Sequence, residues 1–105
     1  MSIRLDKPWR PRVEAPQLSG QLGVFQLADA SGLVMYIGVA DARSLFGLRS
    51  AVQDAFERVP AACQYRVEST SAYHTRYREL LMIHVAEHGF LPPANPQIEL
   101  GRLQP

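Results

Sequence analysis

The sequence predicts an α+β domain in which a small, antiparallel, three-stranded sheet is flanked by helices. Two apolar runs around a polar spacer indicate a hairpin, one alternating run indicates a third strand, and two runs with a period of three to four residues indicate helices. The expected order is β-β-α-β-α. With 105 residues, 47% of them hydrophobic, the chain is long enough for one domain with a modest core and too short for two.

The first twenty residues, MSIRLDKPWRPRVEAPQLSG, show neither the helical nor the alternating period, and they contain three prolines. We therefore expect residues 1–20 to form an extended arm that lies on the domain, with Trp9 as its anchor. Residues 21–105 are expected to form a single domain that ends in a proline-rich tail.

The hairpin is predicted where the runs LGVFQLADA and GLVMYIGVA meet at Asp29-Ala30-Ser31-Gly32. A polar spacer that ends in glycine, between two apolar runs, is typical of a β-turn that joins two strands. The second run is apolar on both faces. This pattern predicts that the second strand lies centrally in its sheet.

The first helix is predicted from Ser44 onward, with Ser44 as the N-cap. One apolar stripe runs along it at spacings of three and four and comprises Leu45, Leu48, Val52, Phe56 and Val59. Pro60 ends this helix. Asp54 and Arg58 are four residues apart on it and are expected to form an ordinary surface ion pair.

The segment CQYRVEST alternates in the manner of a half-buried strand. The segment SAYHTRYRELLMIHVAEHG is then expected to form a long helix that is capped by Ser71 or Thr70 and stopped by Gly89. His84 and His88 have a spacing that could bind a metal, but without a third ligand we expect core and rim histidines. The apolar character of this helix is compatible with a homodimer, and the oligomeric state stays open.

Composition restricts the function classes only weakly. The formal net charge is +1, and Lys7 is the only lysine among eleven lysine and arginine residues. Arginine suits phosphate because its planar fork can bond two oxygens, although arginine usage also follows coding composition. Cys63 is the single cysteine, which excludes an intramolecular disulfide and favours a reducing, cytoplasmic location. No segment resembles a signal peptide or a membrane span of roughly 20 apolar residues, so no membrane partner is expected.

Two glycine-aromatic triplets carry a family resemblance. Gly23-Val24-Phe25 and Tyr36-Ile37-Gly38 are separated by ten residues between their aromatic positions. A helix with an arginine near its start follows, then a helix with Glu79 ahead of an apolar run, and then Pro93 and Asn95. This pattern resembles the GIY-YIG nuclease superfamily, and the resemblance covers residues 23–95.

The resemblance implies an endonuclease that hydrolyses phosphodiester bonds in DNA with one Mg²⁺ or Mn²⁺ ion. It implies that Tyr36 acts near the attacking water as a general base, for which the alternative is a strand tyrosine that packs its ring and hydrogen-bonds its hydroxyl. It also implies that Arg49 contacts the phosphate and that Glu79 binds the metal ion. A carboxylate is a suitable ligand for Mg²⁺, whose other positions water and phosphate can fill. For Arg49 the alternative is Arg43, because the loop after Gly38 is longer than is usual in the family.

Further substrate contacts are expected from Gly38, Arg43, His74 and Arg76. Gly38 would let the backbone approach the substrate, and its alternative is a plain strand-ending glycine. His74 lies beside Arg76 and Arg78 in the sequence and could face phosphate. For Glu79 the alternative to a metal ligand is an ion pair at the boundary of the core, with Arg76 three residues earlier as partner.

Two positions depart from the family pattern. Phe25 stands where the family usually has tyrosine, and Val39 stands where it often has lysine. Losing one positioned acid-base group can lower a rate on the order of 10²- to 10⁴-fold. Two hypotheses therefore stay open: an active metal-dependent endonuclease, and a catalytically impaired domain that binds nucleic acid, with DNA expected over RNA, or protein.

Overall fold

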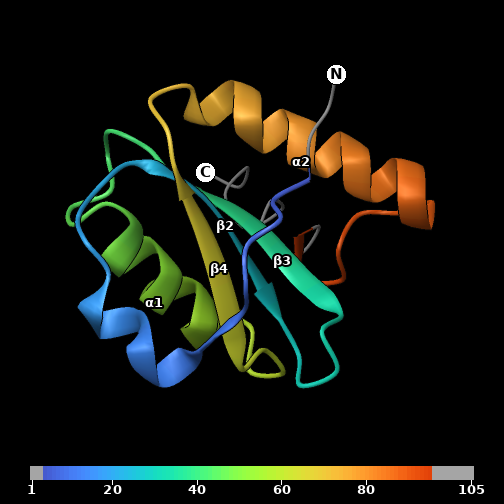
Figure 1. Ribbon diagram of the computed structural model, residues 1–105, viewed down its shortest axis with the longest axis horizontal. Helices are drawn as coiled ribbons and strands as arrows, with labels where there is room; N and C mark the ends of the chain where they lie inside the picture. Colours follow the sequence, from blue (N-terminus) through green and yellow to red (C-terminus); the bar gives the residue numbers. More distant parts are fainter. Residues whose placement is uncertain (1–3, 96–105) are drawn as a thin grey trace, which may run out of the picture.

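The computed structural model describes residues 4–95 and contains one four-stranded antiparallel sheet with the strand order β1-β4-β2-β3. The elements are β1 (Arg10–Pro11), the 3₁₀ helix η1 (Arg12–Gln17), β2 (Gly23–Ala28), β3 (Val34–Ala40), α1 (Leu48–Arg58), β4 (Gln64–Ser69) and α2 (Tyr73–His88). The two α-helices lie on opposite faces of the sheet (Figure 1). The α+β class with an antiparallel sheet and flanking helices is thus confirmed. The part of the chain that is described contains no helix long and apolar enough to cross a membrane.

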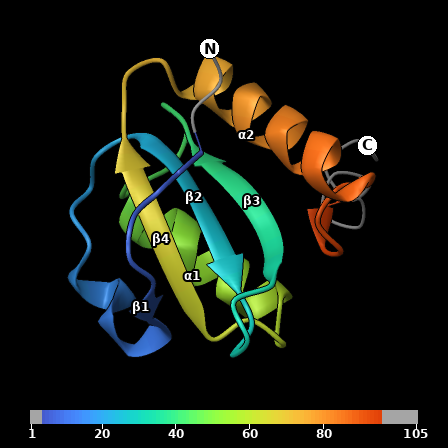
Figure 2. The same ribbon diagram turned by 45° about the vertical axis from the view of Figure 1, so that its right-hand side comes forward.

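The prediction of three strands is wrong because the N-terminal segment adds a fourth. In β1, Arg10 pairs with Tyr65 and Pro11 pairs with Gln64, and η1 follows directly. Ahead of β1 the chain crosses the sheet on the face away from α1 (Figure 2). There Leu5 is buried, and the Arg66 guanidinium lies 4.1 Å from the centre of the Trp9 ring.

The predicted hairpin is formed by β2 and β3, and a short turn joins them. The Asp29 carboxylate accepts hydrogen bonds from the main-chain N–H groups of Ser31 (2.9 Å) and Leu33 (3.0 Å). Gly32 takes a φ of +91°, a conformation that glycine adopts without steric cost. The Ser31 hydroxyl also donates to the Asp29 carboxylate, and this bond is the main cause that lowers the pKa of Asp29 below its usual value. The two main-chain bonds lower this pKa further. The turn therefore fixes the register of the two motif strands.

Alternation along the strands divides the interior into two apolar clusters. The cluster on the α1 face contains the strand residues Phe25, Leu27, Tyr36, Ala40 and Tyr65 together with the helix residues Leu48, Val52, Ala55 and Phe56. The cluster on the α2 face is smaller and joins Leu5, Val24, Ile37 and Leu80. Neighbouring residues of one strand thus contact different helices.

The central position predicted for the second strand is wrong, because β3 is at the edge of the sheet. Its two faces are nevertheless apolar because a helix covers each of them. Its outer edge is covered as well. The Ala94 N–H donates to the Met35 carbonyl (2.9 Å), and the Asn95 side chain bonds the Ile37 main chain. A covered edge therefore has the same sequence pattern as a central strand.

The first helix begins at Leu48, and the predicted N-cap at Ser44 is wrong. The N-cap is Gly47, which has a φ of +57° and abuts the carbonyl oxygens of Gly20 and Gln21. The Leu48 N–H donates to the Gln21 carbonyl (2.8 Å), so the chain ahead of β2 fixes the helix start. Residues 41–47 form a loop, and Leu45 is 82% exposed. The rest of the predicted apolar stripe is buried.

The last helix, α2, begins at Tyr73, and no side chain caps it. The Thr70 hydroxyl instead accepts a hydrogen bond from the Ala72 N–H (3.1 Å). Gly89 ends the helix in the left-handed conformation, as predicted. Met82 and Val85 lie on the exposed side of α2, and the homodimer stays a prediction. The proline-rich tail after Asn95 lies outside the described residues.

Candidate functional site

The motif residues Phe25, Tyr36 and Gly38 form one packed unit on the α1 face of the sheet. Phe25 and Gly38 are directly opposite each other in the β2-β3 register, and the Phe25 and Tyr36 ring centres are 5.9 Å apart. A Cβ atom at position 38 would lie 2.3 Å from Phe25 Cζ and 2.8 Å from Tyr36 Cε2. The two rings therefore fill the space that the missing side chain of Gly38 leaves, a known way to stabilise a glycine in a strand.

Tyr36 is only 5% exposed and lies at the base of a groove that we call the loop-helix groove. It consists of two adjoining pockets of about 320 and 760 Å³, which share Ser44, Ala51 and Asp54. The first pocket also contains Phe25, Tyr36, Val39, Ala55 and Arg58, and the second contains Asp41, Arg43, Leu45, Phe46 and Ser50. The groove thus follows the loop after β3 and one side of α1.

Arg43 lies at the mouth of the loop-helix groove, with its side chain 84% exposed. Its guanidinium is 3.1 Å from the Asp41 carboxylate, and its main-chain N–H donates to the same carboxylate (2.9 Å). Burial of Asp41 acts to raise the pKa of that carboxyl, but the N–H and the guanidinium of Arg43 outweigh burial and lower it. Asp41 is therefore ionised and partly neutralises Arg43.

Arg49, the first choice for the phosphate contact, lies in the first turn of α1 beside the groove. Its guanidinium carbon is 5.0 Å from the centre of the Phe46 ring, and Phe46 is 51% exposed. An arginine stacked on an aromatic ring is a favourable cation-π contact that holds the guanidinium at the surface. Arg49 is not among the residues that line the pocket of Tyr36.

Asp54 and Arg58 join Tyr36 in its pocket, although the sequence pattern predicted an ordinary surface pair. Neither residue forms an ion pair within the described chain, so the predicted pair is wrong. Sequence reasoning missed their location because helical spacing alone does not show which strand residue a helix face meets. The signal that could have found them is their position three and seven residues after Ala51, on the edge of the apolar stripe.

Glu79 lies on the other face of the sheet, in a cluster with Arg76 and Glu68. Arg76 Nη1 donates to Glu79 (2.9 Å) and Arg76 Nε donates to Glu68 (2.8 Å). Glu68 is opposite Val24, which packs in the cluster on the α2 face. The hydrogen bond to Glu68, followed by that to Glu79, raises the pKa of Arg76 above its usual value against the effect of burial. Tyr36 and Glu79 are therefore separated by the sheet.

The histidines of α2 differ in their surroundings. His74 is exposed in the first turn, with its ring 4.8 Å from that of Tyr73, and its charge helps to lower the pKa of Asp41. His84 is buried with its Nδ1 atom 2.8 Å from the Phe90 carbonyl oxygen, whereas His88 is exposed. The last two are the core and rim histidines that the sequence predicted.

A metal ion at Glu79 does not fit the arrangement of the described residues. The Glu79 and Glu68 carboxylates both bond the Arg76 guanidinium, and that positive charge would oppose a cation at the same oxygens. Within residues 4–95, no three histidine, cysteine, aspartate or glutamate side chains come together as a metal-binding group.

The fold and the loop-helix groove define a small α+β domain in which a motif tyrosine, three arginines and an exposed phenylalanine lie on one side. Residues 3–87 match the family described as a domain of unknown function, DUF7508, and the protein belongs to that family. No curated protein matches the chain.

Proposed function

We propose that this protein is a GIY-YIG-like domain that binds DNA in the loop-helix groove and does not cleave it. The observation that carries the proposal is the placement of Glu79. It bonds Arg76 on the α2 face, whereas Tyr36 packs in the cluster on the α1 face. This favours the impaired binding module over the active endonuclease.

Cleavage requires the catalytic groups to act on one phosphate. A general base must lie within hydrogen-bond reach of the attacking water, and a misplacement of even 1 Å can lower the rate about 10²-fold. Tyr36 packs on the α1 face of the sheet and Glu79 bonds Arg76 on the α2 face, so the sheet backbone lies between the two side chains. Phe25, which lacks a hydroxyl, packs against Gly38. This arrangement supports the proposal that the residues which the resemblance implies for catalysis do not act together on one phosphate.

Binding requires less, and the groove offers two elements that suit nucleic acid. Three arginines lie in or beside the groove, namely Arg43, Arg49 and Arg58. One guanidinium group can donate to two phosphate oxygens at once. Phe46 exposes about half of its surface, and unpaired bases stack on exposed aromatic rings. We therefore assign DNA with unpaired bases as the ligand. Because Asp41 and Asp54 also line the groove and offset part of this charge, the affinity is expected to be modest and to fall steeply with salt.

Fluorescence anisotropy of a labelled single-stranded DNA tests the proposal. Phe46→Ala and Arg49→Ala are each expected to weaken binding by about tenfold, since a stacked base is worth roughly 1–3 kcal/mol. Arg78→Ala is the matched control, because it removes the same charge from the exposed side of α2. Equal weakening by Arg78→Ala would show a nonspecific charge effect and would contradict a site in the groove.

The endonuclease stays as the second candidate function, and one observation favours it. Tyr36 shares its pocket with Asp54 and Arg58, so a phenol, a carboxylate and a guanidinium lie together on the α1 face. Nicking of supercoiled plasmid that is lost in Asp54→Asn, with Glu79→Ala unaffected, would support this candidate over the binding module.

A further inference from the structure

The outer edge of β4 is open at Val67. The strand pairs with β2 along its whole length, but β1 pairs with it only at Gln64 and Tyr65. The Arg12 N–H donates to the Cys63 carbonyl (3.0 Å). The Cys63 carbonyl therefore points away from β2. Main-chain groups of alternate residues point to the same side of a strand, so the N–H and carbonyl of Val67, four residues further on, also point away from β2. No described strand lies beside them.

The chain itself explains why pairing stops there. Continuing the β1-β4 register by two residues would place Pro8 opposite Val67, and proline has no N–H to donate. Ahead of Arg10 the chain instead turns across the sheet. The Arg66 guanidinium fixes this path, because it donates to the Lys7 carbonyl (3.3 Å) and lies against the Trp9 ring.

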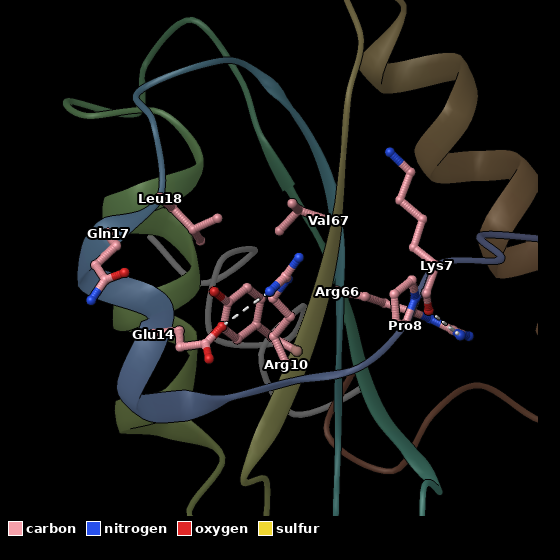
Figure 3. Close-up of a pocket in the computed structure, with 9 residues that line it drawn as sticks. Lys7, Pro8, Arg10, Glu14, Gln17, Leu18, Arg66 and Val67 are labelled. Atoms are coloured by element: carbon pink, nitrogen blue, oxygen red, sulfur yellow. Dashed lines mark hydrogen bonds and ion pairs between the residues drawn. The ribbon is translucent and has the colours of Figure 1, made fainter.

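The open edge lies in a groove of about 370 Å³, which we call the β4 groove. Figure 3 shows Glu14, Gln17 and Leu18 on one side and Lys7 and Pro8 on the other, with β4 between them. Leu18 and Val67 supply apolar surface. A walled groove over an unpaired strand edge suits an extended chain, which can pair its main chain and place alternate side chains on the walls.

The charge of the β4 groove is mainly positive. Lys7, Arg10 and Arg66 line it together with one acid, Glu14. Arg10 and Glu14 are 3.4 Å apart in an exposed pair, and such pairs contribute little and exchange readily with other partners. The groove is therefore complementary to acidic side chains.

We propose that the β4 groove binds an extended, acidic segment of a partner protein, which pairs its main chain with Val67. Acidic side chains of the segment lie against Lys7 and Arg10, and apolar side chains alternate with them against Leu18. The β4 groove shares no lining residue with the loop-helix groove, so this site is independent of DNA binding.

The probe is a short, labelled peptide of alternating valine and glutamate, and the control probe replaces glutamate with lysine. We expect the acidic peptide alone to bind and to shift the Val67 amide resonance in a ¹⁵N spectrum of the full chain. Binding of both peptides alike, no binding at millimolar concentration, or shifts confined to another surface would overturn the proposal. A Val67 shift that depends on protein concentration alone would assign the edge to a second copy and would overturn it too.

Two sets of variants locate the peptide. Val67→Pro removes the outward N–H and is expected to abolish binding of the acidic peptide. Val67→Thr keeps the N–H and is expected to bind the peptide. The exposed double variant Lys7→Glu, Arg10→Glu, which changes no residue of β4, is expected to weaken binding by about tenfold. Arg78→Glu on α2 is the charge control. Unchanged binding by the double variant would overturn the proposal even if Val67→Pro fails to fold.

Discussion

The side-chain amide of Asn95 makes two hydrogen bonds to the main chain of Ile37, the central residue of the Tyr36-Ile37-Gly38 motif. Its Oδ1 atom accepts from the Ile37 N–H and its Nδ2 atom donates to the Ile37 carbonyl, both at 2.9 Å. Asn95 is 1% exposed and Ile37 is fully buried. Asn95 thus acts as a strand partner for the outer edge of β3.

Asn95→Ala is expected to lower the free energy of unfolding by about 2–4 kcal/mol. The substitution leaves the buried N–H and carbonyl of Ile37 without partners, and each such group costs roughly 1–3 kcal/mol. Urea denaturation measures the change. The carboxylate of Asn95→Asp can still accept from the Ile37 N–H. At a pH above the pKa of the new carboxyl, the free energy of unfolding of Asn95→Asp is therefore expected to lie between those of the wild type and Asn95→Ala. A loss below about 0.5 kcal/mol for Asn95→Ala would argue against this role.

Gly38→Ala is expected to destabilise the protein by about 1–3 kcal/mol, because the added Cβ atom forces the packed Phe25 and Tyr36 rings to move. A double-mutant cycle with Phe25→Leu separates this effect from a general loss of strand stability. The cost of Gly38→Ala should be smaller in the Phe25→Leu background. Additive effects of the two substitutions would contradict a packed unit.

The sequence predicted elements well where the local pattern decides them. The Asp29 turn, the stripe from Leu48 to Val59 and the Gly89 stop needed only neighbouring residues. The start of α1 could not be predicted because Gly47 is held by Gly20 and Gln21, which lie distant in sequence. Likewise β1 depends on a pairing across more than fifty residues.

The candidate site was harder to predict than the fold, because a site depends on which face each side chain occupies. The motif pattern predicted that Tyr36 and Glu79 belong to one active site. In a strand, however, side chains alternate between faces, and Tyr36 faces α1 whereas its neighbour Ile37 faces α2. The weaker alternative for Glu79, an ion pair with Arg76, is the contact that the structure contains.

Arg76→Met is expected to lower the free energy of unfolding by about 1–3 kcal/mol, more than Glu79→Gln does. It leaves two neighbouring carboxylates without their shared partner, and uncompensated, partly buried charges are costly. Arg78→Met, on the exposed side of the same helix, should change the free energy by less than about 0.5 kcal/mol. If the Arg76 and Arg78 variants were equally stable, the ion pairs of Arg76 with Glu68 and Glu79 would have no structural role.

His84 is expected to make stability depend on pH. Burial lowers the pKa of His84, the Phe90 carbonyl partly offsets this effect, and the charge of His88 lowers the pKa further. The unfolded chain, with a histidine pKa of about 6.5, then takes up the proton more readily than the folded chain. The free energy of unfolding should therefore decrease as the pH falls below about 6.5, toward the lowered folded-state pKa. His84→Gln should reduce this slope; equal slopes in the wild type and His84→Gln would contradict the assignment.

Phe25→Tyr is expected to fold and to remain inactive on plasmid DNA with Mg²⁺ or Mn²⁺. The substitution adds the hydroxyl that the GIY-YIG pattern has at this position, but it leaves Glu79 on the other face of the sheet. Agarose electrophoresis of supercoiled plasmid checks the prediction. Nicking by Phe25→Tyr that is absent from the wild type would show that the missing hydroxyl alone accounts for inactivity.

The most direct test of binding without cleavage is one native gel of end-labelled single-stranded DNA, incubated with the full chain and Mg²⁺ or Mn²⁺ at low salt. A denaturing gel of the same samples shows whether the DNA is intact. We predict that the wild type retards the DNA and leaves its length unchanged, and that Phe46→Ala abolishes most of the retardation. DNA that is shortened by the wild type and left intact by Glu79→Ala would contradict the account.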